Sequence, residues 1–437
     1  MNYDCIIIGG GIAGLTCGIK CASEGLRCAI ISSGMSALHF SSGSIDLLGS
    51  HSGQDVIKEP YTELNRFIEE NSEHPYKKCG TDTIKDAFSF FQNEVSAQGL
   101  DLFSNEEKNH FHVTPVGTLK TTFLSQQSVF NKKIRDAFFR KPKIAVINID
   151  GFRDFYPAVG RINLKKNRLF KDCEIITGSI SLPDIKLNPK NPHEFRSIDI
   201  CRIFDSYLDL NKISSLISSV AGDADIVGIP AFLGLNNYTV IIKSLREKTG
   251  YIIYEIPTLP PSILGIRLDN ILKSRYAELG GVFIAGDRVI GGKISNGILE
   301  YIHTENHPET RLYAGSYVLS TGSFFSGGMT SNVEKIQEPV FDLAIDYDKG
   351  RENWRGQAFF HPQSHPFLSF GVKTNDYLNP YGPSGELIEN LFCTGAVLSH
   401  YDPVKEGTGS GVAISTGFLA GTQIVQRKTG QNKRDHD

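Results

Sequence analysis

The chain has 437 residues, with 45 lysines and arginines against 48 aspartates and glutamates and a net charge of −3. It is long enough for two or three domains with large cores. The small net charge argues against nucleic acid or an acidic surface as the main partner. The chain is also rich in glycine, with 43 residues, as cofactor-binding α/β proteins are.

The amino-terminal segment carries a glycine motif between a strand and a helix. An apolar strand is predicted over 5–8 and a helix over about 12–24, and Gly9, Gly11 and Gly14 lie at their junction. In a dinucleotide fingerprint the first glycine allows the tight turn and the second lets a phosphate approach the backbone. The third lets the helix pack close to the strand, and the helix N-terminus faces the phosphate. The motif predicts a Rossmann-type α/β fold of the kind that binds FAD or NAD(P).

The second strand of this unit, predicted over 27–31, is not followed by the usual acid. Dinucleotide sites carry an Asp or Glu there, which holds the ribose hydroxyls of the adenosine. Here 32–34 read Ser-Ser-Gly, and no acid occurs between Glu24 and Asp46. A serine can still hydrogen-bond a ribose, so FAD stays open as the alternative. The omission favours FMN as the cofactor.

The middle of the chain alternates strands and helices a second time. After a polar connection and a helix over about 83–98, strands are predicted over 144–149, 225–229 and 251–254, with a helix over 238–248. This pattern predicts a second α/β unit inserted in the first.

The predicted domains follow from where the motifs lie. We expect a parallel-sheet flavin-binding domain of residues 1–50 and 270–437. The inserted α/β domain of residues 51–269 is expected to act as a cap or to contact substrate or a partner.

The last third of the chain returns to strands that end in glycine. Strands are predicted over 281–286 and 298–302, with an Asn-Gly turn at 296–297 before the second. A third strand, over 316–320, leads to Gly322, and a further strand ends at Gly395. Both glycines are expected beside the cofactor.

A second glycine loop follows and opens a helix over about 412–426. Its glycines are Gly407, Gly409 and Gly411. The dipole of such a helix faces the N1–C2=O edge of a flavin ring, where negative charge builds on reduction.

The cysteines and the apolar runs bear on other classes of site. The eight cysteines form no Cys-x-x-Cys pair, so we expect no metal, neither an iron–sulfur cluster nor zinc. Free thiols suit the reducing cytoplasm. The sequence shows no signal peptide, and no apolar run approaches the roughly 18 residues that span a bilayer.

Several segments resemble the B subunit of anaerobic glycerol-3-phosphate dehydrogenase. They are 36–48, 114–119, 257–268 and 321–328, and the similarity continues in order from residue 1 to about 427. In that family the A subunit is a catalytic FAD enzyme that oxidises sn-glycerol 3-phosphate, and the B subunit is an FMN flavoprotein. The C subunit is a membrane anchor that carries iron–sulfur clusters and passes electrons towards menaquinone and fumarate.

The resemblance implies the partners and the location of this chain. The partners are the A and C subunits, with sn-glycerol 3-phosphate as the small-molecule substrate, and the membrane is reached only through a partner. The chain is expected in the cytoplasm, peripheral to the inner face of the cell membrane.

The residues expected to contact the flavin fall into four groups along the chain. They are Gly9, Gly11 and Gly14 at the phosphate; Ser41, Ser42 and Gly43 at the ribityl chain or ring; Gly322 and Gly395 at strand ends; and Gly407, Gly409 and Gly411 beside the ring. For 41–43 a serine-rich turn is the alternative.

Alcohol oxidation needs a base near the carbinol proton and a hydride acceptor at flavin N5. His39 and His400 are candidate bases. His361 and His365 are further candidates for a base. Their helical spacing suggests a metal pair, but neighbouring prolines interrupt that helix.

A substrate phosphate calls for an arginine. Arg267 follows a Pro-Pro turn and is expected to point inward, with Arg351 and Arg355 as further candidates. For each of the three, a surface position is the alternative.

Three functions remain open from the sequence. The first is a flavin-bearing subunit of glycerol-3-phosphate:quinone oxidoreductase. The second is a self-contained FAD reductase of the fumarate reductase or ketosteroid dehydrogenase type. The third is a non-redox scaffold that keeps the fold without the cofactor.

Overall fold

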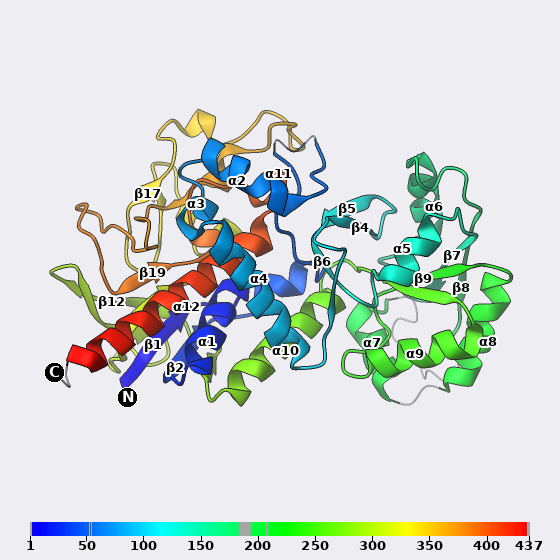
Figure 1. Ribbon diagram of the computed structural model, residues 1–437, viewed down its shortest axis with the longest axis horizontal. Helices are drawn as coiled ribbons and strands as arrows, with labels where there is room; N and C mark the ends of the chain where they lie inside the picture. The colour runs from blue at the N-terminus through cyan, green and yellow to red at the C-terminus, as the bar shows by residue number, and fades with distance from the viewer. Residues whose placement is uncertain (1, 52, 54, 183–193, 207–208, 435–437) are drawn as a thin grey trace. The chain divides into compact units, whose positions relative to one another are not determined.

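The structure is a computed structural model that describes residues 2–51, 53, 55–182, 194–206 and 209–434 (Figure 1). The chain forms two compact units. The first contains residues 1–37, 46–100 and 269–437, and the second contains residues 38–45 and 101–268.

A five-stranded parallel sheet forms the centre of the first unit. Its strands follow the order β11 (Val282–Ala285), β2 (Cys28–Ser32), β1 (Asn2–Ile8), β14 (Tyr313–Leu319) and β19 (Leu391–Cys393). The last four residues of β1 are all buried, as expected for a parallel strand covered on both faces. The predicted strands at both ends of the chain therefore meet in one sheet, which confirms the predicted α/β class.

Two helices from opposite ends of the chain pack together against this sheet. They are α1 (Ile12–Ser23) and α12 (Gly409–Arg434), which lie side by side in Figure 1. Their backbones come close where α12 has a glycine. A Cβ atom at Gly417 would lie 2.4 Å from the carbonyl oxygen of Ala13.

Three helices between residues 60 and 96 also belong to the first unit. They are α2 (Pro60–Glu70), α3 (Pro75–Cys79) and α4 (Thr81–Ser96), and the last two pack on α12. The predicted boundary at residue 51 is therefore wrong, because the apolar faces of these helices are buried in the first unit. Residues 38–45 depart from it in the other direction, since Ile45 forms a bridge with Leu124 of the second unit.

A β-hairpin and a long irregular stretch complete the first unit. β12 (Val289–Ser295) pairs with β13 (Ile298–Thr304) through the predicted turn, where Asn296 and Gly297 have φ of 52° and 73°. Two positive φ angles are the mark of a type I′ hairpin turn. Between β14 and β19 only short two-residue strands occur: β15 (Thr330–Ser331), β16 (Ile336–Gln337), β17 (Ile345–Asp346) and β18 (Gly371–Val372).

The second unit has a parallel sheet of its own. Its order is β10 (Ile252–Ile256), β9 (Ile226–Pro230), β7 (Ile144–Ile149) and β8 (Ile175–Ile180), so strands were predicted correctly at three of these places. Figure 1 shows α5 (Lys132–Phe138) and α6 (Pro157–Lys166) on one face. The other face is covered by α7 (Ser197–Ser206), α8 (Leu210–Ala221) and α9 (Tyr238–Thr249).

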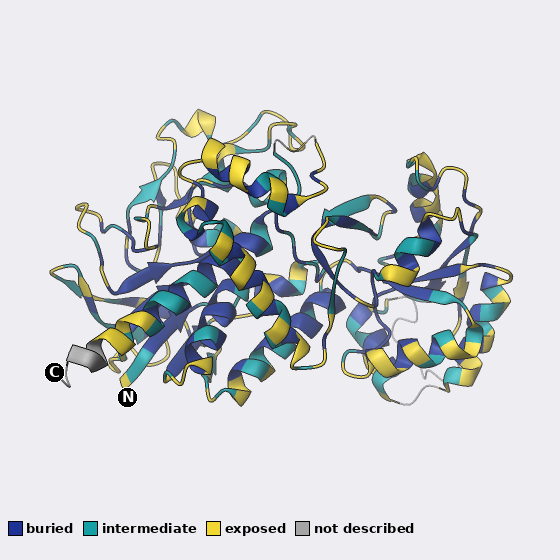
Figure 2. Cartoon of the chain, in the orientation of Figure 1, coloured by how far each residue is buried: buried dark blue, intermediate teal, exposed yellow. Residues whose placement is uncertain are grey.

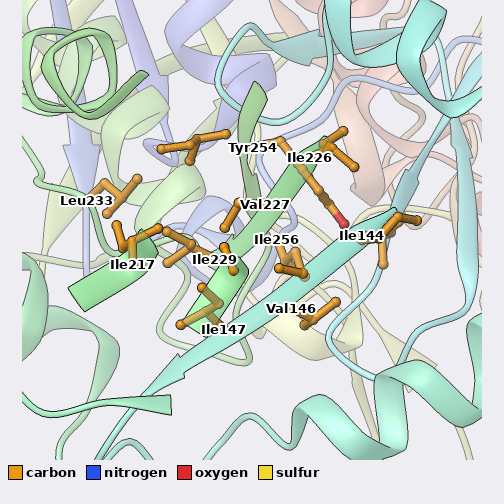
Figure 3. Close-up of a cluster of buried hydrophobic side chains, with 14 of the residues drawn as sticks. Ile144, Val146, Ile147, Ile217, Ile226, Val227, Ile229, Leu233, Tyr254 and Ile256 are labelled. Carbon is orange, nitrogen blue, oxygen red and sulfur yellow. The ribbon is translucent and has the colours of Figure 1, made fainter. Parts of the chain in front are cut away.

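The core of the second unit lies between this sheet and its helices. Figure 3 shows Ile144, Ile226 and Val227 from the strands and Ile217 from α8 within one apolar cluster. Two short antiparallel pairs flank it, β3 (Leu102–Ser104) with β6 (Leu124–Gln126) and β4 (His110–Val113) with β5 (Leu119–Thr122). The chain passes from the second unit to the first within α10 (Ile263–Glu278).

Burial follows the same plan in both units. Figure 2 shows the strands of the two parallel sheets in dark blue and the outer faces of the helices in yellow. Among the residues that the structure describes, no helix is long and apolar enough to cross a membrane.

Candidate functional site

The glycine turn between β1 and α1 shows different constraints at its three glycines. Gly9 has φ of 113°, and a Cβ atom there would lie 2.3 Å from the carbonyl oxygen of Ser320. A Cβ at Gly14 would lie 2.1 Å from the carbonyl oxygen of Gly9. At Gly11, the N-cap of α1, a Cβ would meet nothing within 4 Å. Gly9 and Gly14 are therefore required by packing, whereas Gly11 faces open space at a helix N-terminus.

The ends of two neighbouring strands border this turn. Ser320 and Thr394 follow β14 and β19, and their hydroxyl oxygens are 2.5 Å apart. Gly322 and Gly395 come next, with φ of 85° and 70°, conformations that favour glycine. The buried hydroxyl of Thr321 has no hydrogen-bond partner. The predicted strand-end glycines thus lie at one edge of the sheet with the glycine turn.

The start of α1 packs against α12 about two turns after the start of that helix. The backbone N–H of Gly395 donates to Oγ1 of Thr416, 2.9 Å away, and a Cβ at Gly395 would lie 2.8 Å from that of Ala13. Gly411 is six residues before Gly417, or about 9 Å along the helix. Both helix N-termini therefore lie within the length of one flavin.

The second glycine loop packs against residues far away in the sequence. Gly407 has φ of 62°. A Cβ at Gly409 would lie 3.2 Å from that of Pro403, and one at Gly411 would lie 2.0 Å from the hydroxyl oxygen of Tyr76. Close packing explains Gly411 directly.

His74 and Glu406 hold this second glycine loop in place through hydrogen bonds. Nδ1 of His74 accepts from the backbone N–H of Tyr76 at 3.0 Å, so in the neutral ring the proton is on Nε2. That nitrogen donates to Glu406, 3.2 Å away. The carbonyl oxygen of Glu406 also accepts from the N–H groups of Gly49 and Ser50. Sequence reasoning missed His74 and Glu406, because they are 332 residues apart and match no motif.

The predicted ribityl-binding loop belongs to the second unit. Oγ of Ser41 donates to Leu38, and the hydroxyls of Ser42 and Ser44 are 2.8 Å apart. Lys120 donates to Ser44 at 2.9 Å. Gly43 has φ of 69°, and a Cβ there would lie 2.5 Å from that of Leu264. These contacts support the serine-rich turn, and flavin binding by 41–43 stays a prediction.

Arg267 does not have the position expected of a substrate ligand. Its side chain is fully buried, with one nitrogen 2.6 Å from Glu255 and another donating to Gly234 at 3.0 Å. The ring of Tyr238 lies 4.0 Å from the guanidinium carbon. All its surroundings are internal partners, so the prediction of phosphate binding is corrected to a structural role.

The histidine candidates have different surroundings. His39 is half-buried in the second unit, and its carbonyl oxygen accepts from Ser262. His400 is in the first unit, with Nε2 2.9 Å from Asp346. This hydrogen bond lowers the pKa of the Asp346 carboxyl. His400 also has φ of 66°, a conformation that non-glycine residues rarely adopt outside constrained sites.

No metal centre is present in the part of the chain that the structure describes, where no three His, Cys, Asp or Glu side chains gather. All eight cysteines are buried and free. Nδ1 of His361 accepts from the N–H of Gln363, and both ring nitrogens of His365 have backbone partners.

The parallel sheet, its glycine turn at a helix N-terminus and the second helix beside it define the class of dinucleotide-type flavoproteins. The family model described as an FAD binding domain matches residues 4–412. The chain therefore carries a flavin-binding domain.

Comparison with curated proteins narrows the class to one family. The B subunit of anaerobic glycerol-3-phosphate dehydrogenase from Aliivibrio fischeri (strain MJ11) is 40% identical over 98% of this chain and 96% of its own length. The B subunit from Vibrio cholerae (El Tor strain N16961) is 39% identical over 97% of each chain. This chain belongs to the family of B subunits of anaerobic glycerol-3-phosphate dehydrogenase, which confirms the predicted relationship and a flavin-dependent oxidoreductase subunit.

Solved structures resemble the chain more distantly. 3-Ketosteroid delta1-dehydrogenase from Sterolibacterium denitrificans is 11% identical, with a TM-score of 0.49 over 98% of this chain and 100% of that one. A flavocytochrome c3 fumarate reductase is 8% identical, with a TM-score of 0.42 over 97% and 78%. This likeness is too low to support an inference about substrate or activity.

Proposed function

We propose that this chain is the flavin-containing subunit of an anaerobic glycerol-3-phosphate dehydrogenase. The complex oxidises sn-glycerol 3-phosphate to dihydroxyacetone phosphate and passes two electrons through its subunits to menaquinone and fumarate. The observation that carries the proposal is the open space at Gly11, at the N-terminus of α1, in a chain related to the B subunits over 98% of its length.

The residues around the glycine turn fit a flavin phosphate. The open N-terminus of α1 offers N–H groups and a positive dipole end, and Gly11 leaves room for the phosphate. The unpartnered hydroxyl of Thr321 is a further group for the cofactor. A bound flavin would supply a hydride acceptor, and the N-terminus of α12 would stabilise the negative charge of its reduced form.

FMN is the proposed cofactor, with FAD as the alternative. No acid follows β2, and the hydroxyl of Ser32 already donates to Gly34. The ring of Phe283 lies beside Gly10 and Ser32, because a Cβ at Gly10 would lie 2.7 Å from that ring. The segment after β2 therefore has no acid that could bind an adenosine ribose, and the Phe283 ring fills the space beside Gly10. Both observations support FMN over FAD.

His400 is the proposed acid–base group, with His39 as the second candidate. Asp346 is placed to orient the His400 imidazole, because its carboxylate lies 2.9 Å from Nε2. The expected result of His400→Ala is a loss of turnover of about 100-fold with normal flavin content. A variant with unchanged turnover would remove His400 from the reaction.

The proposed partners are the catalytic FAD protein, which is the A subunit of the complex, and the iron–sulfur protein, which is the C subunit. This chain would be a cytoplasmic protein, held at the inner face of the membrane by those partners. A chain whose described residues contain neither a metal cluster nor a membrane-spanning helix fits that division of labour.

Reconstitution tests the proposal. The chain alone should not oxidise glycerol 3-phosphate with a quinone analogue, and adding the A and C subunits should restore turnover. High turnover by the chain alone would favour the self-contained reductase. Full turnover of the A and C subunits without this chain would favour the scaffold.

A further inference from the structure

Two neighbouring phenylalanines in the first unit are almost fully exposed. Phe359 and Phe360 are 83% and 89% exposed, more than any other large apolar side chain among the described residues. Their rings pack edge to face with centroids 4.9 Å apart. Burying two such rings is favourable because it removes a large apolar area from water, so exposed aromatic surfaces of this kind mark binding sites.

The backbone next to the phenylalanine pair is held in place by His365. Nδ1 of His365 accepts from the N–H of Gly356 at 3.1 Å, and Nε2 lies 2.9 Å from the carbonyl oxygen of Phe359. The imidazole stacks on Phe367, with centroids 5.8 Å apart, and Phe367 packs on Phe324. The backbone that carries the phenylalanine pair is therefore held in one conformation by His365. This lowers the entropic cost of docking, because less order has to be imposed on binding.

The same segment presents cations without internal acid partners. Lys349, Arg351 and Arg355 are exposed and form no ion pair with any residue that the structure describes. The Asp348 carboxylate accepts from Gly350 and Asn353, which holds it against its own segment. The surface thus combines exposed apolar rings with a charged surround in which three cations outnumber the exposed carboxylates of Asp348 and Glu352.

From this combination we infer that Phe359 and Phe360, with Lys349, Arg351 and Arg355, form the surface that docks on another subunit of the complex. The fitting partner is a protein face with an apolar pocket for the two rings and a rim of carboxylates. The inference rests on the proposed function, which makes this chain one subunit of several.

Two other occupants fit less well. In a two-fold dimer the same patch faces itself, so its three cations would meet like charges. On an anionic lipid surface, the exposed Asp348 and Glu352 would face negative headgroups. A supported aromatic pair within a polar, charged surround is instead typical of a protein–protein hot spot.

The test compares Phe359→Ser/Phe360→Ser with the wild type in binding to the purified A and C subunits, each measured by interferometry. The matched control is Phe139→Ser/Tyr156→Ser, which removes two aromatic side chains that are 66% and 65% exposed in the second unit. Flavin content and melting temperature should be unchanged in both variants. The first variant should bind one partner at least about tenfold more weakly, while the control binds normally. Arg351→Glu/Arg355→Glu should slow association and reverse its salt dependence.

Each other outcome overturns the inference. Binding of the first variant within threefold of the wild type would place the interface elsewhere. Loss of binding only to phosphatidylcholine–phosphatidylserine vesicles would make this a membrane surface, and loss only of self-association would make it a dimer contact. If the wild type binds neither of the two partners, the proposed function itself fails, which is distinct from a failure of the variant.

Discussion

At the residue scale, glycine occurs at three positions of one turn for different physical reasons. Gly9 and Gly14 have backbone oxygens where a Cβ would be, whereas Gly11 has only open space. The same substitution should therefore have different consequences at Gly11 and Gly14. These positions are roughly five ångströms apart, since three residues span nearly one helical turn.

Gly11→Val should yield a folded protein that has lost most of its flavin, because the valine fills the space that a phosphate needs. Gly14→Val should instead lower the free energy of unfolding by about 3 kcal/mol, because its Cβ meets a carbonyl oxygen that cannot move freely. Flavin absorbance and urea denaturation measure the two effects. Normal flavin content in Gly11→Val would count against the phosphate assignment.

Arg267 is predicted to matter for stability rather than for substrate binding. Arg267→Met leaves the buried Glu255 carboxylate without its cation, which should cost about 3–5 kcal/mol in the free energy of unfolding. The double variant Arg267→Met/Glu255→Met should recover part of this loss. Urea denaturation checks both, and an unchanged stability with a raised KM would restore Arg267 as a substrate ligand.

Glu338 predicts a pH dependence of stability. It is 1% exposed, and burial raises the pKa of its carboxyl from 4.5 to about 7, although the N–H groups of Val340 and Phe341 donate to it. The folded protein thus binds this proton more tightly than the unfolded chain. Stability should fall as pH rises from about 4.5 to 7, by on the order of 3 kcal/mol.

Glu338→Gln cannot ionise and isolates this effect. The amide loses one acceptor oxygen, which lowers the stability of the variant, but its side chain adds no pH dependence to the free energy of unfolding. Melting temperatures between pH 4.5 and 8 should show a smaller decline in the variant than in the wild type. Parallel curves for the two proteins would exclude Glu338 as the titrating group.

At the element scale, the position of the α12 N-terminus depends on contacts with distant loops. His74, Tyr76 and residues 46–50 hold the turn from Glu406 to Gly411. His74→Leu removes one of these contacts. The loosened helix end should stabilise the reduced flavin less and lower its midpoint potential by about 10–20 mV.

A redox titration of His74→Leu measures this shift. Thr422→Ala, near the middle of α12 and more than three turns from its N-terminus, is the control and should keep the wild-type potential. An unchanged potential in His74→Leu with full flavin content would mean that the helix end does not act on the ring.

Local signals in the sequence predicted the helices and strands well. They could not predict contacts between residues that are far apart in the sequence. The strand at 144–149 and the Asn296–Gly297 turn have short-range causes, namely apolar runs and positive φ angles. The pairing of His74 with Glu406 and the ion pair of Arg267 depend on where the chain returns after folding. The helices over 60–96 were assigned to the wrong unit for the same reason.

At the scale of the whole molecule, each unit is built on a parallel sheet, but their ligand crevices differ. In the second unit the strand order reverses between β7 and β9, where doubly wound sheets bind ligands. Phe152 and Phe232 pack together there, and Asp205 accepts from the N–H groups of Leu235 and Asn237 at the start of α9. Phe152 also lines a pocket with Asn148 and Ser179 in the second unit, whereas the open space of the first unit lies at Gly11.

The first unit is proposed to hold a flavin mononucleotide at Gly11. The most direct measurement is acid release of the cofactor from the purified chain, followed by mass analysis and quantitation. We predict about one FMN per chain in the wild type and its loss in Gly11→Val. The reason is that the glycine turn fits one phosphate, and no acid is placed to bind an adenosine ribose. Stoichiometric FAD would contradict the mononucleotide, and a folded chain that neither contains nor takes up any flavin would contradict flavin binding by this unit.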